Sequence, residues 1–145
     1  MKIAIRYYSE TGNTEKLANA ISKVTEAKAL SIDNPLDENV DILFLGSSVY
    51  YSSAPKKIKT FIKNINVKVG TVVNFSTASI MRGTYNSVKR QVIAKNIDMS
   101  TREFHCKGSW GAFYEARPND KDLNNCREFA KQILLEQESK AIKES

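Results

Sequence analysis

Three hydroxyl side chains and one glycine lie within six residues near the N-terminus, in the segment Ser9-Glu10-Thr11-Gly12-Asn13-Thr14. Apolar residues then recur at helical spacing and predict a helix over Thr14–Thr25. Unpaired N–H groups and the dipole at a helix start attract anions, and Gly12 lets the backbone approach a ligand closely. An N-cap needs only one Ser, Thr or Asn, whereas this segment supplies four. The segment therefore predicts a phosphate site, with the hydroxyls of Ser9, Thr11 and Thr14 as donors.

Other phosphate motifs are absent from the sequence. It contains neither G-x-x-x-x-G-K-S/T nor G-x-G-x-x-G, which argues against a P-loop NTPase and a dinucleotide fingerprint. The first loop has no cysteine nucleophile, and Gly46-Ser47-Ser48 stands where a phospho-acceptor receiver would need an aspartate. The first loop also has no Lys or Arg, which suits a cofactor phosphate that is bound and left intact.

The elements that must position this loop alternate strictly between strand and helix. Strands are predicted over Lys2–Tyr8, Ala27–Ile32, Asp41–Gly46, Gly70–Phe75 and Thr101–Cys106. Between and after them, helices are predicted over Thr14–Thr25, from Pro55 through Ile65, over Gly83–Lys95, and from Asp120 to Glu136. This alternation predicts one α/β domain over residues 1–145, with a parallel sheet between two helix layers. The polar stretch 137–145 is expected to fray.

The segment Ser9–Thr14, following a first strand, resembles the FMN-phosphate loop of the flavodoxins, written S/T-x-T-G-x-T. The resemblance extends along nearly the whole chain, as five β/α units in 145 residues. It implies a flavodoxin-like three-layer α/β/α fold with a five-stranded parallel sheet in the order 2-1-3-4-5. It also implies non-covalent FMN, no metal, and electron transfer without catalytic side chains.

The resemblance also implies which loops would flank the flavin. The loop after the third strand would present an aromatic ring to the isoalloxazine, and Tyr50 or Tyr51 could supply it; the alternative is that both only pack on their loop. The loop after the fourth strand would meet the pyrimidine edge through its backbone amides. The cofactor-binding residues expected from these two loops are Ser48, Val49, Tyr50, Tyr51, Ser76, Thr77, Ala78 and Ser79.

The charge balance departs from that of the flavodoxins, which resemble one another in being acidic. The chain has 22 Lys and Arg against 16 Asp and Glu, a net charge of +6. We therefore expect a redox partner protein with an acidic docking surface, contacted by Lys56, Lys57 and Lys59, or a small-molecule electron acceptor. The two loops beside the flavin contain no Asp or Glu, and the second contains Arg82. This favours the reduced flavin by Coulomb attraction. Tyr51 stands where the resemblance implies a glycine that allows the peptide to flip, so we expect a less favoured neutral semiquinone and two one-electron potentials that lie closer together than in the acidic carriers.

Two other functions stay open at this point. An FMN-dependent reductase could act directly on a quinone, a tetrapyrrole or another small acceptor, so whether the protein is an enzyme is undecided. A basic nucleic-acid-binding domain is the remote alternative, because the sequence has no DNA- or RNA-recognition motif. The first residues belong to a predicted strand and show no signal-peptide pattern. No apolar run is long enough for a membrane helix, and the sequence has only two cysteines. A cytoplasmic location with free thiols is expected.

Overall fold

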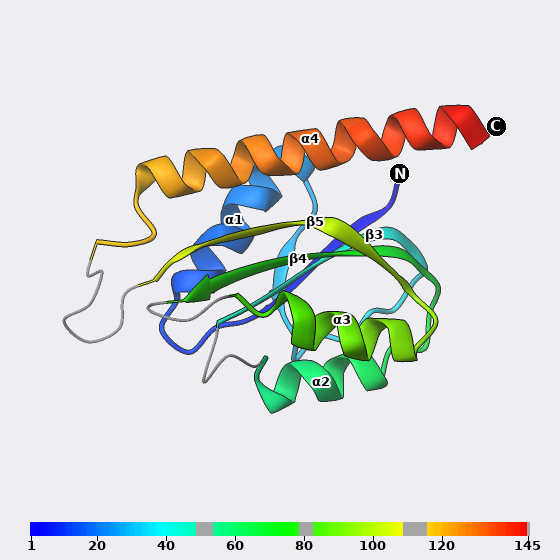
Figure 1. Ribbon diagram of the computed structural model, residues 1–145, viewed down its shortest axis with the longest axis horizontal. Coiled ribbons are helices and arrows are strands. Elements are labelled where there is room, and N and C mark those ends of the chain that lie inside the picture. The colour runs from blue at the N-terminus through cyan, green and yellow to red at the C-terminus, as the bar shows by residue number, and fades with distance from the viewer. Residues whose placement is uncertain (49–53, 79–82, 109–115, 145) are drawn as a thin grey trace.

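The computed structural model describes residues 1–48, 54–78, 83–108 and 116–144, and places a central sheet between two helix layers (Figure 1). The strands are β1 (Ile3–Tyr8), β2 (Ala29–Ser31), β3 (Val40–Ser48), β4 (Val69–Ala78) and β5 (Asp98–Lys107). The helices are α1 (Asn13–Thr25), α2 (Lys56–Lys63), α3 (Tyr85–Ala94) and α4 (Asp120–Glu144). All strand pairs are parallel, in the order β2-β1-β3-β4-β5. The predicted flavodoxin-like three-layer fold is confirmed.

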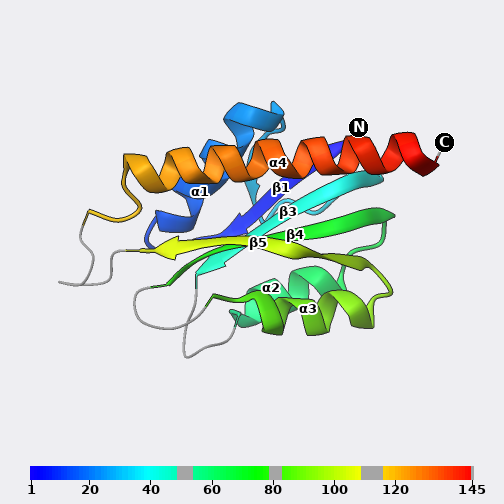
Figure 2. The same ribbon diagram turned by 45° about the horizontal axis from the view of Figure 1, so that its top comes forward.

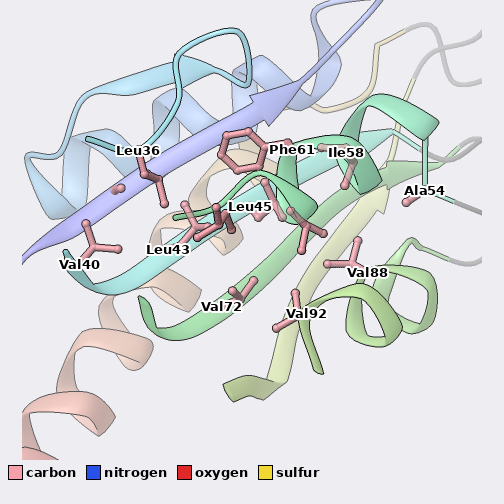
Figure 3. Packing of buried hydrophobic residues seen from close by; sticks show 13 residues of the cluster. Leu36, Val40, Leu43, Leu45, Ala54, Ile58, Phe61, Val72, Val88 and Val92 are labelled. Atoms are coloured by element: carbon pink, nitrogen blue, oxygen red, sulfur yellow. The ribbon is translucent and has the colours of Figure 1, made fainter. Parts of the chain in front are cut away.

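The two helix layers cover opposite faces of the sheet because successive strand residues point in opposite directions. In β3, Leu43 and Leu45 face the layer of α2 and α3, where they pack in one buried cluster with Ile58 and Val88 (Figure 3). The intervening Phe44 faces the other layer and packs in a second cluster with α1 and α4. A near-continuous apolar run is therefore required in β3, which is buried on both faces.

Several boundaries differ from the sequence-based prediction. β3 continues past Gly46 to Ser48, and β4 continues past Phe75 to Ala78, so Ser76, Thr77 and Ala78 are strand residues and not a loop. Hydropathy alone ended both strands too early, because their last residues are polar. Tertiary contacts supply hydrogen-bond partners for the buried hydroxyls of Ser76 and Thr77, so that burying these groups in a sheet costs little.

The C-terminal helix is also longer than predicted. α4 continues through Glu144, where fraying was expected from residue 137. The stretch after Glu136 is mostly exposed but is rich in Glu, Gln, Lys and Ala and has no Gly or Pro, which favours helix on propensity alone. Within the described ranges, no helix has the length and apolar character needed to cross a membrane.

Candidate functional site at the carboxyl edge of the sheet

The first loop lies between the end of β1 and the start of α1, at the point where the strand order reverses between β1 and β3. Ligands of open α/β sheets bind at such switch points. Gly12 holds the N-cap position with φ 87°, a left-handed conformation that glycine adopts without strain. The hydroxyl of Ser9 accepts a hydrogen bond from the Gly12 amide at 3.0 Å. Because Gly12 has no side chain, no N-cap side chain covers the first turn of α1.

Thr11 and Thr14 occupy different environments, although both belong to the predicted phosphate motif. Thr11 is exposed at the loop surface. Thr14 is completely buried, and its Oγ1 lies 3.0 Å from Oγ1 of Thr77 near the end of β4. The hydroxyl of Thr14 therefore joins α1 to the sheet, and Thr11 and Ser9 are the hydroxyls left at the surface of the loop.

The end of β5 packs closely against this junction. Gly108 donates its amide to the carbonyl of Ala78 at 3.2 Å. A Cβ added at Gly108 would lie 3.1 Å from both Nδ2 of Asn13 and Cβ of Thr77. Sequence reasoning did not assign Gly108 to the site; its position directly after a predicted strand was the available signal.

Ser48 is the last residue of β3 and lies beside Thr77, its register partner on β4. Its Oγ is the only buried side-chain oxygen or nitrogen without a hydrogen-bond partner among the residues that the structure describes. A buried hydroxyl without a partner costs about 1–3 kcal/mol, so such groups usually mark a place where a ligand or water supplies the partner. Ser48 belongs to the predicted cofactor-binding set, and its orphan hydroxyl suits a polar ligand atom at this edge.

Glu10 brings a negative charge to the first loop, and its carboxylate accepts a hydrogen bond from the Tyr8 hydroxyl at 2.7 Å. This hydrogen bond is the main cause that raises the pKa of the Tyr8 phenol. On the same ring, the ammonium of Lys57 lies 5.4 Å from the centroid, within the range of a cation–π contact. The start of α2 is thereby placed beside the first loop.

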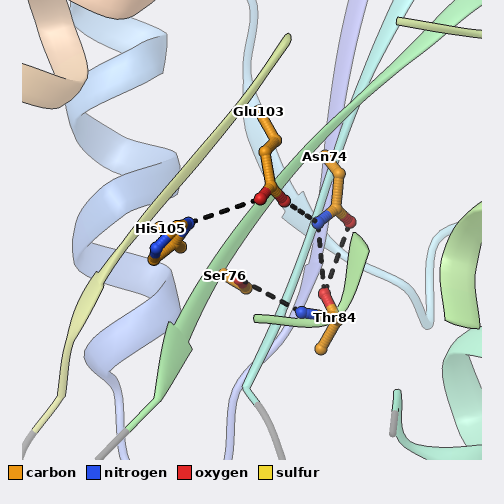
Figure 4. A network of polar contacts seen from close by, with 5 residues as sticks. All are labelled: Asn74, Ser76, Thr84, Glu103 and His105. Carbon is orange, nitrogen blue, oxygen red and sulfur yellow. Dashed lines mark hydrogen bonds and ion pairs between the residues drawn. The ribbon is translucent and has the colours of Figure 1, made fainter. Parts of the chain in front are cut away.

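A network of polar side chains lies between β4, β5 and the start of α3 (Figure 4). Oγ1 of Thr84 contacts Nδ2 of Asn74 at 3.2 Å and accepts from the hydroxyl of Ser47 at 3.1 Å, and all three residues are buried. The Thr84 amide donates to Oγ of Ser76 at 3.4 Å. The carboxylate of Glu103 continues the network to Asn74 at 3.5 Å and to the exposed His105 at 3.4 Å.

The predicted site residues Ser76 and Thr77 lie on opposite faces of the sheet. The side chain of Ser76 serves the network on the α3 face, whereas Thr77 points to the α1 face. Val49, Tyr50, Tyr51 and Ser79 lie outside the described residues, as do Arg82 and the aromatic residues Trp110, Phe113 and Tyr114. Sequence reasoning missed Asn74 and Thr84, because isolated polar residues in a strand and a helix start do not form a recognisable motif.

Comparison with solved structures defines the class to which this fold belongs. A flavodoxin from the domain Archaea superposes with a TM-score of 0.75 over 92% of this chain and 96% of that one, at 18% identity. Oxidised Flavodoxin 2 from Bacillus cereus gives 0.65 over 90% and 95%, at 18% identity. Rubredoxin oxygen:oxidoreductase from Desulfovibrio gigas gives 0.74 at 14% identity, with 97% of this chain matching 37% of that protein. The class is therefore that of flavodoxin-like α/β proteins.

The sequence comparisons give the family itself. The family model of the flavodoxin domain matches residues 4–112. An uncharacterized protein of Methanocaldococcus jannaschii is 30% identical over 92% of this chain and 99% of its own length. The chain belongs to the flavodoxin-domain family, and fold and family together support a flavin-binding, flavodoxin-like protein.

Proposed function

We propose that the protein binds FMN at the carboxyl edge of the sheet and transfers electrons between redox partners. The observation that carries this proposal is the first loop. Its Gly12 N-cap leaves the start of α1 without a side-chain cap, beside the hydroxyls of Ser9 and Thr11, at the β1/β3 switch point.

The residues present fit the chemistry of a bound flavin phosphate. Ser9 and Thr11 supply hydroxyl donors, and the start of α1 supplies the positive end of a helix dipole. The buried Ser48 hydroxyl, which lacks a partner within the described ranges, offers a further donor on β3. When bound, FMN supplies the one- and two-electron chemistry that the side chains of this site do not provide.

The side chains have supporting roles in this proposal. Thr14 and Thr77 fix the start of α1 relative to β4, which holds the loop amides in place. Gly108 allows the end of β5 to close against the same junction. Among the described residues, no group of His, Cys, Asp and Glu is placed to hold a metal ion.

The phosphate interaction is tested by comparing FMN with riboflavin in calorimetric titrations of the flavin-free chain. We expect Ser9→Ala with Thr11→Ala to weaken FMN binding at least about tenfold, because each lost hydrogen bond to a charged group is worth ~1.5–3 kcal/mol. Riboflavin, which has no phosphate, should bind the variant as it binds the wild type. Thr101→Ala, at an exposed position of β5, is the matched control. Equal weakening of both ligands would place the phosphate elsewhere.

Steady-state oxidation of NAD(P)H distinguishes an FMN-dependent reductase from an electron carrier. A carrier receives its electrons from a protein donor, so NAD(P)H with a quinone acceptor should show no sustained oxidation by the FMN-loaded protein. Sustained turnover would support an FMN-dependent reductase in place of a carrier. Reduction by a donor protein followed by electron transfer to an acceptor protein would support the proposal.

A further inference from the structure

The net positive charge of the chain arises from one continuous stretch. Between Ile42 and Ile97 the sequence has nine Lys and Arg and no Asp or Glu, so the rest of the chain carries more acidic than basic residues. The nine basic residues are Lys56, Lys57, Lys59, Lys63, Lys68, Arg82, Lys89, Arg90 and Lys95.

This stretch contains both helices of one layer of the fold, α2 and α3, together with strand β4 and most of strand β3. α2 and α3 lie side by side on one face of the sheet, opposite α1 and α4 (Figure 2). Six of the nine basic residues belong to these two helices, and each of the six is exposed or half-buried. α4, in the opposite layer, contains six carboxylates and five cationic side chains. We name the surface of α2 and α3 the basic face.

Within the described parts of the chain, no ion pair is found between a cation of the basic face and a carboxylate. Each of the five ion pairs found among the described residues joins side chains outside residues 42–97. The four ammonium groups of α2 lie along one short helix, so they repel one another unless a partner of opposite charge approaches.

The basic face begins at the edge that contains the candidate flavin site. α2 starts at Lys56, and the ammonium of Lys57 lies over the ring of Tyr8, whose hydroxyl contacts Glu10 of the first loop. A protein bound to α2 would thus lie beside the first loop. On α3 the exposed Ile93, with 52% of its surface accessible, provides an apolar contact next to Arg90.

We propose that the basic face is the docking surface for an acidic redox protein, an inference that rests on the proposed electron-transfer function. Protein interfaces combine apolar contacts with a charged rim that steers association, and the basic face offers both. Nucleic acid would also match the charge. It is disfavoured because single-strand binding uses exposed aromatic rings for stacking, and the described rings here, Tyr8 and Tyr85, are engaged by Lys57 and Lys89.

The test uses the full chain and a small acidic ferredoxin as probe, in its redox-inactive gallium form, at about 50 mM salt where charge pairing is weakly screened. Binding is measured by calorimetry and by amide shifts of the labelled protein, with and without FMN. One variant combines Lys59→Gln, Lys63→Gln and Arg90→Gln on the basic face. The control combines Lys121→Gln, Lys140→Gln and Lys143→Gln on α4, and changes the net charge equally.

We expect the basic-face variant to lose about tenfold in affinity and the control less than twofold, with the largest shifts on α2 and α3. Equal losses in both variants, or shifts centred on α1 and α4, would overturn the proposal. Tighter binding of a 12-nucleotide single strand than of ferredoxin, lost in the basic-face variant, would assign the face to nucleic acid. Docking is also measured on the flavin-free chain, so a failure of FMN binding can be distinguished from a failure of docking.

Discussion

The hydroxyl groups of Thr14 and Thr77 lie 3.0 Å apart in the interior, although 63 positions separate them in the chain. One of the two donates and the other accepts, and both residues are almost completely buried. This contact joins the first turn of α1 to the carboxyl end of β4, directly below the first loop. It gives Thr14 a role in positioning the loop. That Thr14 also donates to a phosphate, as the motif predicts, stays a prediction.

Breaking this contact should lower the free energy of unfolding. Thr77→Val leaves the Thr14 hydroxyl buried without a partner, and we expect a loss of about 1–3 kcal/mol in the free energy of unfolding, measured in urea. Thr14→Val with Thr77→Val removes both groups and should cost clearly less than the sum of the single changes. Additive losses would show that the two hydroxyls do not interact.

The polar network around Thr84 should behave as a unit. Thr84→Val removes the partner of both Ser47 and Asn74, so we expect a loss of about 2 kcal/mol or more in the free energy of unfolding. Thr84→Ser keeps the hydroxyl and should recover most of that loss. Thr101→Val, at an exposed position of β5, controls for the substitution itself. A Ser variant as unstable as the Val variant would show that the methyl group contributes as much stability as the hydroxyl, and would contradict a dominant role of the network.

The start of α4 should be sensitive to acid. Burial by itself raises the pKa of the Asp122 carboxyl, but hydrogen bonds from Arg117 and from the amide of Asn119 outweigh it and hold this pKa below its ordinary value. A depressed pKa contributes stability that is present above the unfolded pKa of ~4 and is lost as pH falls through the folded pKa. The free energy of unfolding is measured by denaturant titration between about pH 6 and about pH 2, which roughly spans that window. We expect it to fall less steeply with decreasing pH in Asp122→Asn than in the wild type.

The matched control for this experiment lies on the same helix. Glu128 is exposed and forms an ion pair with Lys131 at the surface, so Glu128→Gln should change the loss of stability in acid very little. If the free energy of unfolding falls as steeply with decreasing pH in Asp122→Asn as in the wild type, other carboxylates govern acid unfolding.

Both thiols should be inert in the native protein. Burial is the main cause that raises the pKa of Cys106 and of Cys126 to about 12 each. Since the thiolate is the reactive form, iodoacetamide near pH 8 should modify neither residue within the time that labels an unfolded control completely. Mass spectrometry after the reaction distinguishes the two sites. Rapid modification of the half-buried Cys106 in native protein would contradict its placement against the core.

Much of the architecture follows from local patterns in the sequence. The order of elements, the buried β3 run and the hydroxyl-rich first loop were readable because apolar periodicity and turn chemistry act over a few residues. The same reasoning ended β3 and β4 too early, since polar strand residues such as Ser47 and Ser76 look like loop residues until their partner Thr84 is known.

The sequence by itself determined the alternation of strands and helices, the phosphate-type loop at Ser9–Thr14, and the absence of carboxylates from residues 42–97. Only the tertiary structure decided that Thr14 bonds to Thr77, that Ser48 has a buried hydroxyl in need of a partner, and that the two helices of the basic stretch lie side by side on one face. The physical reason is the separation along the chain over which each interaction acts. Helix and strand preferences depend on neighbours in the chain, whereas a buried hydroxyl's partner and the charge of a face depend on residues that only the packed sheet brings together.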